Sequence, residues 1–331
     1  MKIRLISDLH IDINEKYPLD LHIDEANDVF TLVAGDVSGY PKLTIEWIRK
    51  NLYQGAFICG NHDAYDSSMP IEDIKALYHK EFPVNANITF FDNDVGVISK
   101  EIDENVLLVA DVMYIDYKLP IKWTNPRGDQ RRNMMLADPA MNRNGGMNDF
   151  NYGRCNKVFE GINDYKKKKE GTWRLVPQYY LEHHEKAFSE VTKIVESNPN
   201  KHIILMTHMG LSPQCLDSNY ESGEMSASYA SDKEDWIKSH PNIKCIFSGH
   251  VHCRKKFMVG STLYVMNALG YCNRHLKQFS KETNQYECWT PDCFLDTKTW
   301  EVEWKPKDNP VWIAQKNKDD EAFKKFAPFF F

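Results

Sequence analysis

The sequence predicts an α/β fold with a doubly wound core, in which buried strands alternate with helices. Short apolar runs recur along the chain, and most are nearly continuous, as in strands that are buried on both faces. Segments with the 3.6-residue apolar spacing of helices lie between some of these runs. The 331 residues include 42% hydrophobic and 27% charged side chains, so the chain has a globular composition and can bury a large core.

Six apolar runs are predicted to be strands, and two segments are predicted to be helices. The strands are expected over residues 3–6, 30–34, 56–59, 106–110, 203–206 and 243–247. The first helix is expected over 41–52, because Pro41 suits the first turn of a helix. The second is expected over 179–196, where apolar side chains recur on one face.

The chain is predicted to divide into a catalytic domain and a C-terminal extension. The domain is expected over 1–271, interrupted by a polar, glycine-punctuated insertion at about 119–169. This insertion contains Arg131, Arg132 and the lysine run 166–169, and should form a loop or cap. The extension, 272–331, is rich in tryptophan and proline and is expected to pack on the core.

Charge and hydropathy exclude several classes of protein. The formal net charge of −6 and the pI near 6.1 argue against a general polyanion binder, which would carry a basic surface. No apolar run approaches the roughly 18 residues that a membrane helix needs. The N-terminus reaches Asp8 before the core of a signal peptide could form. A cytoplasmic protein without a membrane partner, with its eight cysteines reduced, is therefore expected.

Chemistry-bearing side chains follow five of the predicted strands. Ligands bind beyond the carboxyl ends of strands in α/β sheets, so these side chains should meet at one edge. Carboxylate oxygen and imidazole nitrogen together suit a pair of divalent transition metals such as Mn, Fe, Zn or Ni. The five blocks are Asp8-Leu9-His10, Gly35-Asp36, Gly60-Asn61-His62-Asp63, Thr207-His208 and Gly249-His250-Val251-His252.

The order of the blocks carries more weight than any one of them. Alone, Asp8 could cap a helix and His208 could be a buried core histidine. The spacing, 28 residues from Asp8 to Asp36 and 25 from Asp36 to Asn61, is close to the ~30 residues of a strand–helix–strand unit. An ordered set with each member after its own strand therefore favours a metal centre.

These blocks resemble the pattern D-x-H, G-D, G-N-H-D/E, H and G-H-x-H of the calcineurin-like metallophosphoesterases. The chain is most similar to the small bacterial and phage type, through its Ser-Asp-Leu-His start and its Thr-His-Met-Gly-Leu-Ser-Pro block. Residues 147–150, 229–232 and 267–271 also look like that type, so the resemblance covers about the first 271 residues. It implies a two-sheet α/β sandwich with helices on the outer faces.

The resemblance also implies a role for each site residue. Asp8, His10 and His252 would hold one metal, and Asn61, His208 and His250 the other, with Asp36 bridging the two. His62 would face the leaving group as general acid. Asp63 would either hold or tune His62, or would merely cap the next helix. Asn61 and Asn148 are the expected substrate contacts, and Mn²⁺ the expected metal.

The implied activity is that of a metal-dependent phosphoric ester hydrolase. It would cleave a phosphodiester or a small phosphorylated metabolite through attack by a hydroxide that bridges the metals. A nuclease acting on DNA or RNA by the same mechanism is the alternative, although the chain is not basic; a non-catalytic scaffold is a third. Ile11 and Ser38 depart from the D-x-H-G and G-D-x-V-D-R-G motifs of phosphoprotein phosphatases, so a protein-serine phosphatase is not expected.

Overall fold

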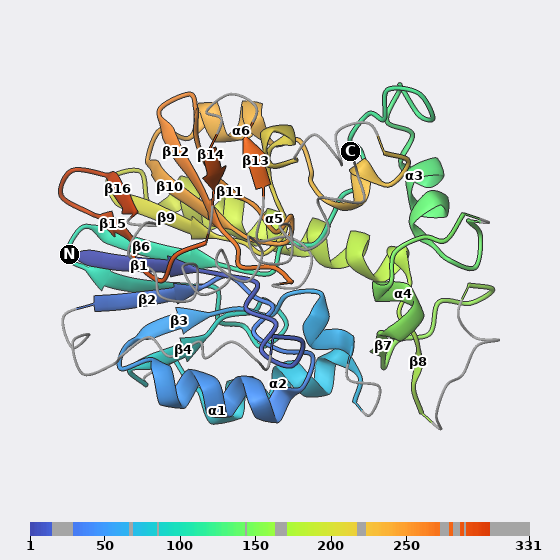
Figure 1. Cartoon of the computed structure of the whole chain (residues 1–331), viewed down its shortest axis with the longest axis horizontal. Coiled ribbons are helices and arrows are strands. Elements are labelled where there is room, and N and C mark those ends of the chain that lie inside the picture. Colours follow the sequence, from blue (N-terminus) through green and yellow to red (C-terminus); the bar gives the residue numbers. More distant parts are fainter. Residues whose placement is uncertain are drawn as a thin grey trace, which may run out of the picture.

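The described part of the chain forms two packed β-sheets with helices on their outer faces (Figure 1). The computed structural model describes residues 1–14, 29–65, 69–84, 86–142, 144–162, 171–216, 223–271, 278–280, 285–287 and 289–304. Within these residues the sheets have six strands each, which confirms the two-sheet sandwich. None of the described helices is long and apolar enough to cross a membrane.

The first sheet has a parallel centre built from the N-terminal part of the chain. Neighbouring strands β1 to β4 are parallel, and the hairpin β15–β16 extends the sheet because β15 pairs antiparallel to β1. The order of strands is β16 (Glu301–Trp304), β15 (Cys293–Asp296), β1 (Lys2–Ile6), β2 (Val29–Val33), β3 (Gly55–Phe57) and β4 (Ile88–Phe90).

The second sheet has a parallel centre with an antiparallel strand at each edge. β12, β10, β9 and β6 are parallel, while β11 and β5 run antiparallel to their neighbours. The order is β11 (Arg254–Val259), β12 (Thr262–Asn267), β10 (Ile243–Ser248), β9 (His202–Met206), β6 (Val106–Ala110) and β5 (Ser99–Asp103).

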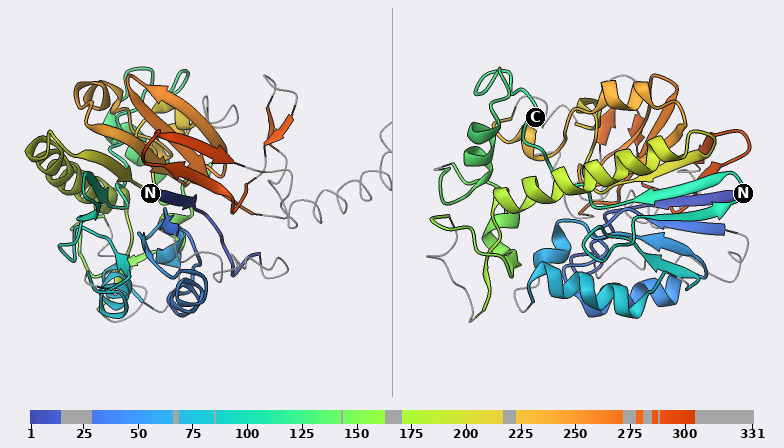
Figure 2. Two further views of the ribbon diagram at one scale, coloured as in Figure 1. Left: turned by 90° about the vertical axis from the view of Figure 1, so that its left-hand side faces the viewer. Right: turned by 180° about the vertical axis from the view of Figure 1, so that it is seen from behind.

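Helices cover both sheets, and a smaller group of elements lies in the segment that the sequence suggested as an insertion (Figure 2). Two pairs of helices lie on the outer faces: α1 (Pro41–Asn51) with α2 (Ile71–Glu81), and α5 (Pro177–Ser197) with α6 (Glu234–Ser239). The insertion and its return strand contain α3 (Gln130–Ala137), α4 (Asp149–Tyr152), β7 (Arg154–Cys155) and β8 (Trp173–Arg174). The remaining short elements are η2 (His62–Tyr65), η3 (Pro213–Cys215), η4 (Ser226–Ser228), β13 (Gln278–Ser280) and β14 (Gln285–Glu287).

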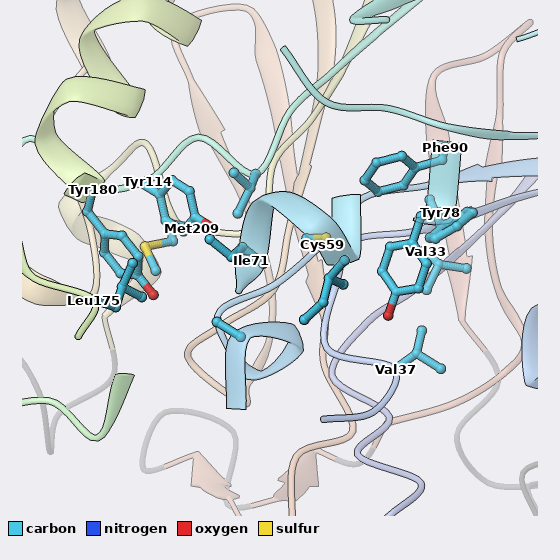
Figure 3. Close-up of a cluster of buried hydrophobic side chains, with 14 of the residues drawn as sticks. Val33, Val37, Cys59, Ile71, Tyr78, Phe90, Tyr114, Leu175, Tyr180 and Met209 are labelled. Atoms are coloured by element: carbon cyan, nitrogen blue, oxygen red, sulfur yellow. The ribbon is translucent and has the colours of Figure 1, made fainter. Parts of the chain in front are cut away.

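Alternating side chains of the strands fill three apolar layers. Leu32 and Leu108 face the layer between the sheets, whereas their neighbours Val33 and Val109 face the helices outside. The layer under α1 and α2 continues toward α5, where Tyr180 joins the same cluster (Figure 3). Burial of each apolar side chain of this kind stabilises the fold by about 1.5–3 kcal/mol. The stable sandwich therefore holds the loops at its edge in place.

The sequence located six of the strands and two of the three longest helices, but it did not show how the strands divide between the two sheets. All six predicted strands and both predicted helices are present, with ends shifted by no more than a few residues. The doubly wound single core inferred from the pattern is corrected: β1, β2 and β3 lie in one sheet, and β6, β9 and β10 in the other. Apolar periodicity shows which segments are buried strands but does not identify their partners.

A buried ion pair joins the insertion segment to its return strand. Arg174 of β8 donates to both carboxylate oxygens of Asp138, at 2.7 and 3.0 Å, and both side chains are buried. Arg131 and Arg132 lie exposed on α3. The lysine run 166–169 lies outside the described residues.

A buried histidine on α5 should make stability depend on pH. His184 lies 2.5 Å through Nδ1 from the Tyr114 carbonyl oxygen, and burial, with Lys233 nearby, lowers its pKa to about 4. The unfolded chain, with a pKa near 6.5, therefore holds more protons than the native state between pH 6.5 and 4. As the pH falls through that window, His184 lowers the free energy of unfolding by up to about 1.4 kcal/mol per pH unit.

His184→Gln should remove this contribution. We expect the difference in unfolding free energy between the native chain and the variant, measured in denaturant, to shrink as the pH falls from 6.5 to 4.5. Above pH 7 the difference should be constant, because the imidazole is neutral in both states. A difference that stays constant down to pH 4.5 would show that His184 titrates normally.

Candidate metal centre

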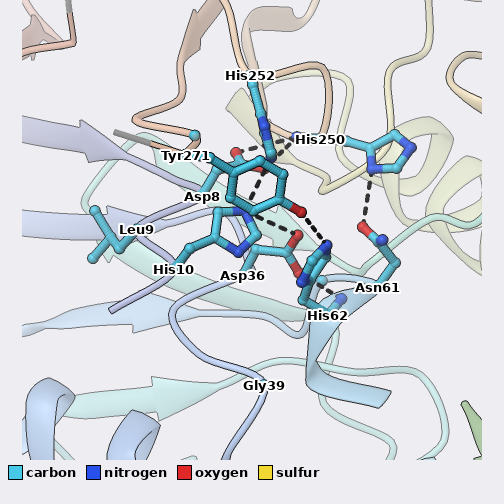
Figure 4. A network of polar contacts seen from close by, with 12 residues as sticks. Asp8, Leu9, His10, Asp36, Gly39, Asn61, His62, His250, His252 and Tyr271 are labelled. Atoms are coloured by element: carbon cyan, nitrogen blue, oxygen red, sulfur yellow. Dashed lines mark hydrogen bonds and ion pairs between the residues drawn. The ribbon is translucent and has the colours of Figure 1, made fainter. Parts of the chain in front are cut away.

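The five predicted blocks meet at one edge of the sandwich. Each follows the carboxyl end of a parallel strand: β1, β2 and β3 in the first sheet, and β9 and β10 in the second. Figure 4 shows side chains from the ends of β1, β2, β3 and β10 pointing toward one another. The edge therefore gathers groups from both sheets into one buried cluster, as the strand-end argument predicted.

The backbone of the ligand loops is held in a conformation that non-glycine residues rarely adopt. Asp8, His10, Asp36, His250 and His252 have φ values of 54°, 41°, 54°, 70° and 50°. The first two loops are joined because His10 N donates to Asp36 O at 3.0 Å. Left-handed φ at such residues costs roughly 1–3 kcal/mol each and persists where the surrounding structure enforces it, typically at functional sites.

Two glycines let the loops approach the carboxylates. A Cβ on Gly60 would lie 2.0 Å from Asp36 Oδ1, and one on Gly249 would lie 2.3 Å from Asp8 Oδ2. Both distances are far inside van der Waals contact with atoms of buried side chains. Any larger residue would displace the carboxylates, which accounts for glycine at these two positions of the blocks.

One group of ligand atoms converges within a small volume. Oxygen or nitrogen atoms of Asp8, His10, Asp36 and His252 all lie within 4.8 Å of one another. His10 Nε2 is 3.0 Å from His252 Nε2, and Asp8 Oδ1 is 3.5 Å from the same His252 atom. This group has the size and the donors of a site for one metal ion.

A second group lies beside the first and shares Asp36 with it. The Asn61 Oδ1 atom is 2.9 Å from His208 Nε2 and 2.9 Å from His250 Nδ1. Asp36 Oδ2 lies 3.8 Å from His10 Nε2 in the first group and 3.4 Å from His208 Nε2 in the second. A single carboxylate oxygen thus faces both groups.

The donor set fits two divalent transition-metal ions. Burial, together with neighbouring histidines, lowers the pKa of His10 and His250 well below the usual range, so both imidazoles are neutral, as metal ligands must be. Burial raises the pKa of Asp8 to about 7, because its charge is poorly hydrated, and the nearby Asp36 carboxylate acts in the same direction. Buried oxygen and imidazole donors of this kind select Mn, Fe, Zn or Ni over alkali metals.

His208 and Asp36 form a strongly coupled pair between the two groups. Burial alone would raise the pKa of Asp36, but His208 and His62 lower it well below its usual range. The Asp36 carboxylate correspondingly raises the pKa of His208 to about 10 against the opposing effect of burial. A divalent cation placed here would replace the His208 proton, so metal binding should release protons.

His62 stands next to the ligands without joining either group. Its backbone N–H donates to Asp36 Oδ1 at 2.8 Å, and its ring stacks on Tyr65 with centroids 4.0 Å apart. Its Nε2 is 2.8 Å from the Tyr271 hydroxyl (Figure 4). The imidazole thus lies at the rim of the cluster, beside the Tyr271 hydroxyl.

Asp63 does not hold His62, and it does not cap the next helix. Its carboxylate accepts hydrogen bonds from Gly60 N and from the Tyr78 hydroxyl, both at 2.7 Å. The N-cap position of α2 is Pro70. The described contacts of the Asp63 carboxylate are thus with the loop that carries Asn61 and with α2.

A cavity of about 240 Å³ opens above the ligands. Part of the insertion lines it, including Asn148, which is exposed there, whereas Arg131 and Arg132 do not. No lysine or arginine is among its described lining residues. These are Asp36, Asn61, His62, Tyr65, Gly146, Met147, Asn148, Asp149, Met225, Tyr229, His250, His252 and Tyr271.

The sequence did not indicate the roles of the aromatic residues and the carboxylate that surround the ligands. Tyr271 contacts the rings of His10 and His252, with centroids 4.7 Å away in each case. Tyr65 lies one short helical turn after His62, a spacing that could have suggested stacking. Asp149 is recruited from the insertion, and only its place in the 147–150 block pointed to it.

Comparison with known families agrees with this geometry. The family model of the calcineurin-like phosphoesterases matches residues 1–254. The chain belongs to this family. No curated protein sequence matches the phosphoesterase.

Three solved structures are similar to this phosphoesterase at low sequence identity. A phosphopantetheinyl hydrolase from Mycobacterium tuberculosis is 14% identical with a TM-score of 0.56, and the match covers 82% of this chain and 89% of that one. A dimetal phosphatase from Danio rerio is 12% identical with a TM-score of 0.44, covering 80% and 86%. Calcineurin-like phosphoesterase YfkN from Bacillus subtilis is 15% identical with a TM-score of 0.40, covering 80% of each chain. The first of these shows the shared fold.

Proposed function

We propose that the chain is a dinuclear metal-dependent phosphoesterase whose natural substrate is a small phosphodiester. One observation carries the proposal. Asp36 Oδ2 lies 3.8 Å from His10 Nε2 in the first ligand group and 3.4 Å from His208 Nε2 in the second. A shared carboxylate is what a pair of adjacent cations requires. When bound, the two cations supply positive charge that activates water and stabilises the phosphoryl oxygens.

Six of the seven proposed ligands belong to one group each, and Asp36 is common to both. Asp8, His10 and His252 hold the first ion, and Asp36 is shared. Asn61, His208 and His250 hold the second ion. We assign Mn²⁺ as the native metal, with Fe, Zn or Ni as the competing choices, because the donors mix oxygen with imidazole nitrogen.

His62 is the proposed general acid. Its Nε2 atom lies at the rim of the cavity beside the Tyr271 hydroxyl, where it can hold a proton for the departing oxygen. Asn148 and the amide of Asn61 line the same cavity and are proposed to contact the substrate. Asp63 has no part in this arrangement, since its carboxylate is occupied by Gly60 and Tyr78.

The charge of the cavity favours a diester. A phosphomonoester carries nearly two negative charges at neutral pH, whereas a diester carries one. The described lining residues include no lysine or arginine, so beyond the metals little positive charge is available for a dianion or for a polynucleotide backbone. A small diester thus fits better than a monoester or a nuclease substrate.

The proposed setting is the cytoplasm.

This preference can be measured with two aryl esters. Protein loaded with Mn²⁺ should hydrolyse bis(nitrophenyl) phosphate with a higher kcat/KM than nitrophenyl phosphate, and a chelator should abolish both activities. The two substrates release the same leaving group, so they differ in the charge of the phosphate and in the second nitrophenyl group of the diester. A higher kcat/KM for the monoester would reverse the assignment, and activity that persists in chelator would remove the metals from the reaction.

A further inference from the structure

The carboxamide of Asn61 is useful to a metal in only one of its two orientations. Its oxygen can bind a cation, whereas its NH₂ group can only donate hydrogen bonds. The oxygen faces His208 Nε2 and His250 Nδ1, each at 2.9 Å. The opposite end of the amide, Nδ2, donates to Asp149 Oδ1 at 2.9 Å. Asp149 accepts from three donors, Asn61 Nδ2 and the hydroxyls of Tyr65 and Tyr180, so as an acceptor it admits the NH₂ end of Asn61 and excludes the oxygen end.

Asp149 is itself held in place by two tyrosines. Its Oδ1 accepts from the Tyr65 hydroxyl at 2.7 Å, and its Oδ2 accepts from the Tyr180 hydroxyl at 3.2 Å. The side chain is 1% exposed, so water does not compete with these donors. Tyr180 comes from α5 and is stacked on Tyr114, with centroids 4.0 Å apart. The carboxylate therefore has a fixed direction set by the core of the fold.

The same carboxylate also reaches the proposed general acid. Tyr65, which donates to Asp149, stacks on the ring of His62 with an interplanar angle of 24°. Asp149 thus contacts one metal ligand directly and the support of His62 through one intervening side chain. It is contributed by α4 of the insertion and is separated in sequence from Asn61 by 88 residues.

We propose that Asp149 is a positioning residue for the second metal site: it fixes the Asn61 amide with its oxygen toward His208 and His250. This inference rests on the proposed dinuclear function. It makes the insertion part of the metal centre, in addition to forming the wall of the cavity. Partners that orient a metal ligand in this way typically change metal affinity 10–100-fold when they are replaced.

Asp149→Asn tests the proposal because it keeps the shape and offers an NH₂ group that lets Asn61 turn over. We expect the second Mn²⁺ ion to bind about 10–100-fold more weakly, while the first ion keeps its affinity. Titration of the full chain with Mn²⁺ by equilibrium dialysis should give one tight ion in place of two. The electron paramagnetic resonance signal of a coupled Mn pair should be lost at the same metal concentration.

Reversing the two groups separates orientation from general damage. Asn61→Asp alone should also weaken binding of the second ion, although a carboxylate is normally the stronger metal ligand. The reason is that the new carboxylate would face the Asp149 carboxylate, which cannot donate a hydrogen bond to it. The double variant Asn61→Asp with Asp149→Asn should recover two ions, since the carboxamide introduced at position 149 can then donate to a carboxylate that presents oxygen on either side. Losses that simply add in the double variant would overturn the proposal, whether or not Asp149→Asn alone folds well.

Asp129→Asn is the matched control. It makes the same charge change in the same insertion, and asparagine can still cap α3 through Arg132 N. It should keep two ions. If Asp149→Asn bound two ions with unchanged affinity, the positioning role of Asp149 would be refuted, and the proposed dinuclear function would not be affected. A native chain that binds fewer than two ions would instead refute the proposed function.

Discussion

Asp36→Asn is expected to cost the protein both metal ions and at least about 10³-fold in kcat/KM. The loss exceeds the 10²–10³-fold that follows removal of one stabilising donor at an active site, because one carboxylate serves both ligand groups. Asparagine keeps the acceptor for the His62 backbone N–H, so the loop should survive. The variant also leaves His208 without the anion that raises its pKa.

Elemental analysis and activity measured on the same sample check this result. The native chain should contain two ions and the variant fewer than one, while circular dichroism shows equal folding. Asp129→Asn again controls for loss of a carboxylate. A variant that retains two ions, or an active native protein with only one, contradicts the bridging role of Asp36.

His62→Gln should have the second largest effect, and its size should depend on the leaving group. A nitrophenolate departs without a proton, whereas the alkoxide of a nucleoside or alkyl ester does not. We expect a loss of about 10²–10⁴-fold in kcat on an alkyl or nucleoside diester and a much smaller loss on bis(nitrophenyl) phosphate. Both ions should remain bound, because His62 belongs to neither ligand group.

Tyr65→Phe is a useful companion to this variant. It keeps the ring that stacks on His62 and removes only the hydroxyl that donates to Asp149. Its losses should therefore be similar on both leaving groups. If His62→Gln also lost activity equally on the two esters, together with metal, His62 would support the loop and would not act as an acid.

The candidate ligands could be located from the sequence because each of the five blocks that contain them follows its own strand. The sandwich brings Asp8 and His252 together although β1 and β10 lie in different sheets. The resemblance, rather than periodicity, predicted the two sheets. Sequence order therefore identified the residues and the edge, but not which strands are neighbours.

The surroundings of the ligands could not be read in the same way. Asp149 and Tyr180 come from distant segments, and nothing in the local pattern says that Asp149 turns toward Asn61 or that Tyr180 turns toward Asp149. Asp63 shows the converse: it directly follows His62, yet its carboxylate points to Tyr78. Side-chain direction at a strand end depends on local backbone angles, which sequence patterns do not fix.

The distance along the chain between the two halves of the first ligand group bears on how the protein is made. His10 meets His252 across 242 positions, and β1 gains its second neighbour only when β15 has been synthesised. During translation the nascent chain must therefore expose one edge of β1 for most of synthesis, which is a hazard for aggregation. A product that stops before residue 252 lacks a ligand of this group. A polypeptide can therefore bind metal stably at the first ligand group only after translation has passed His252.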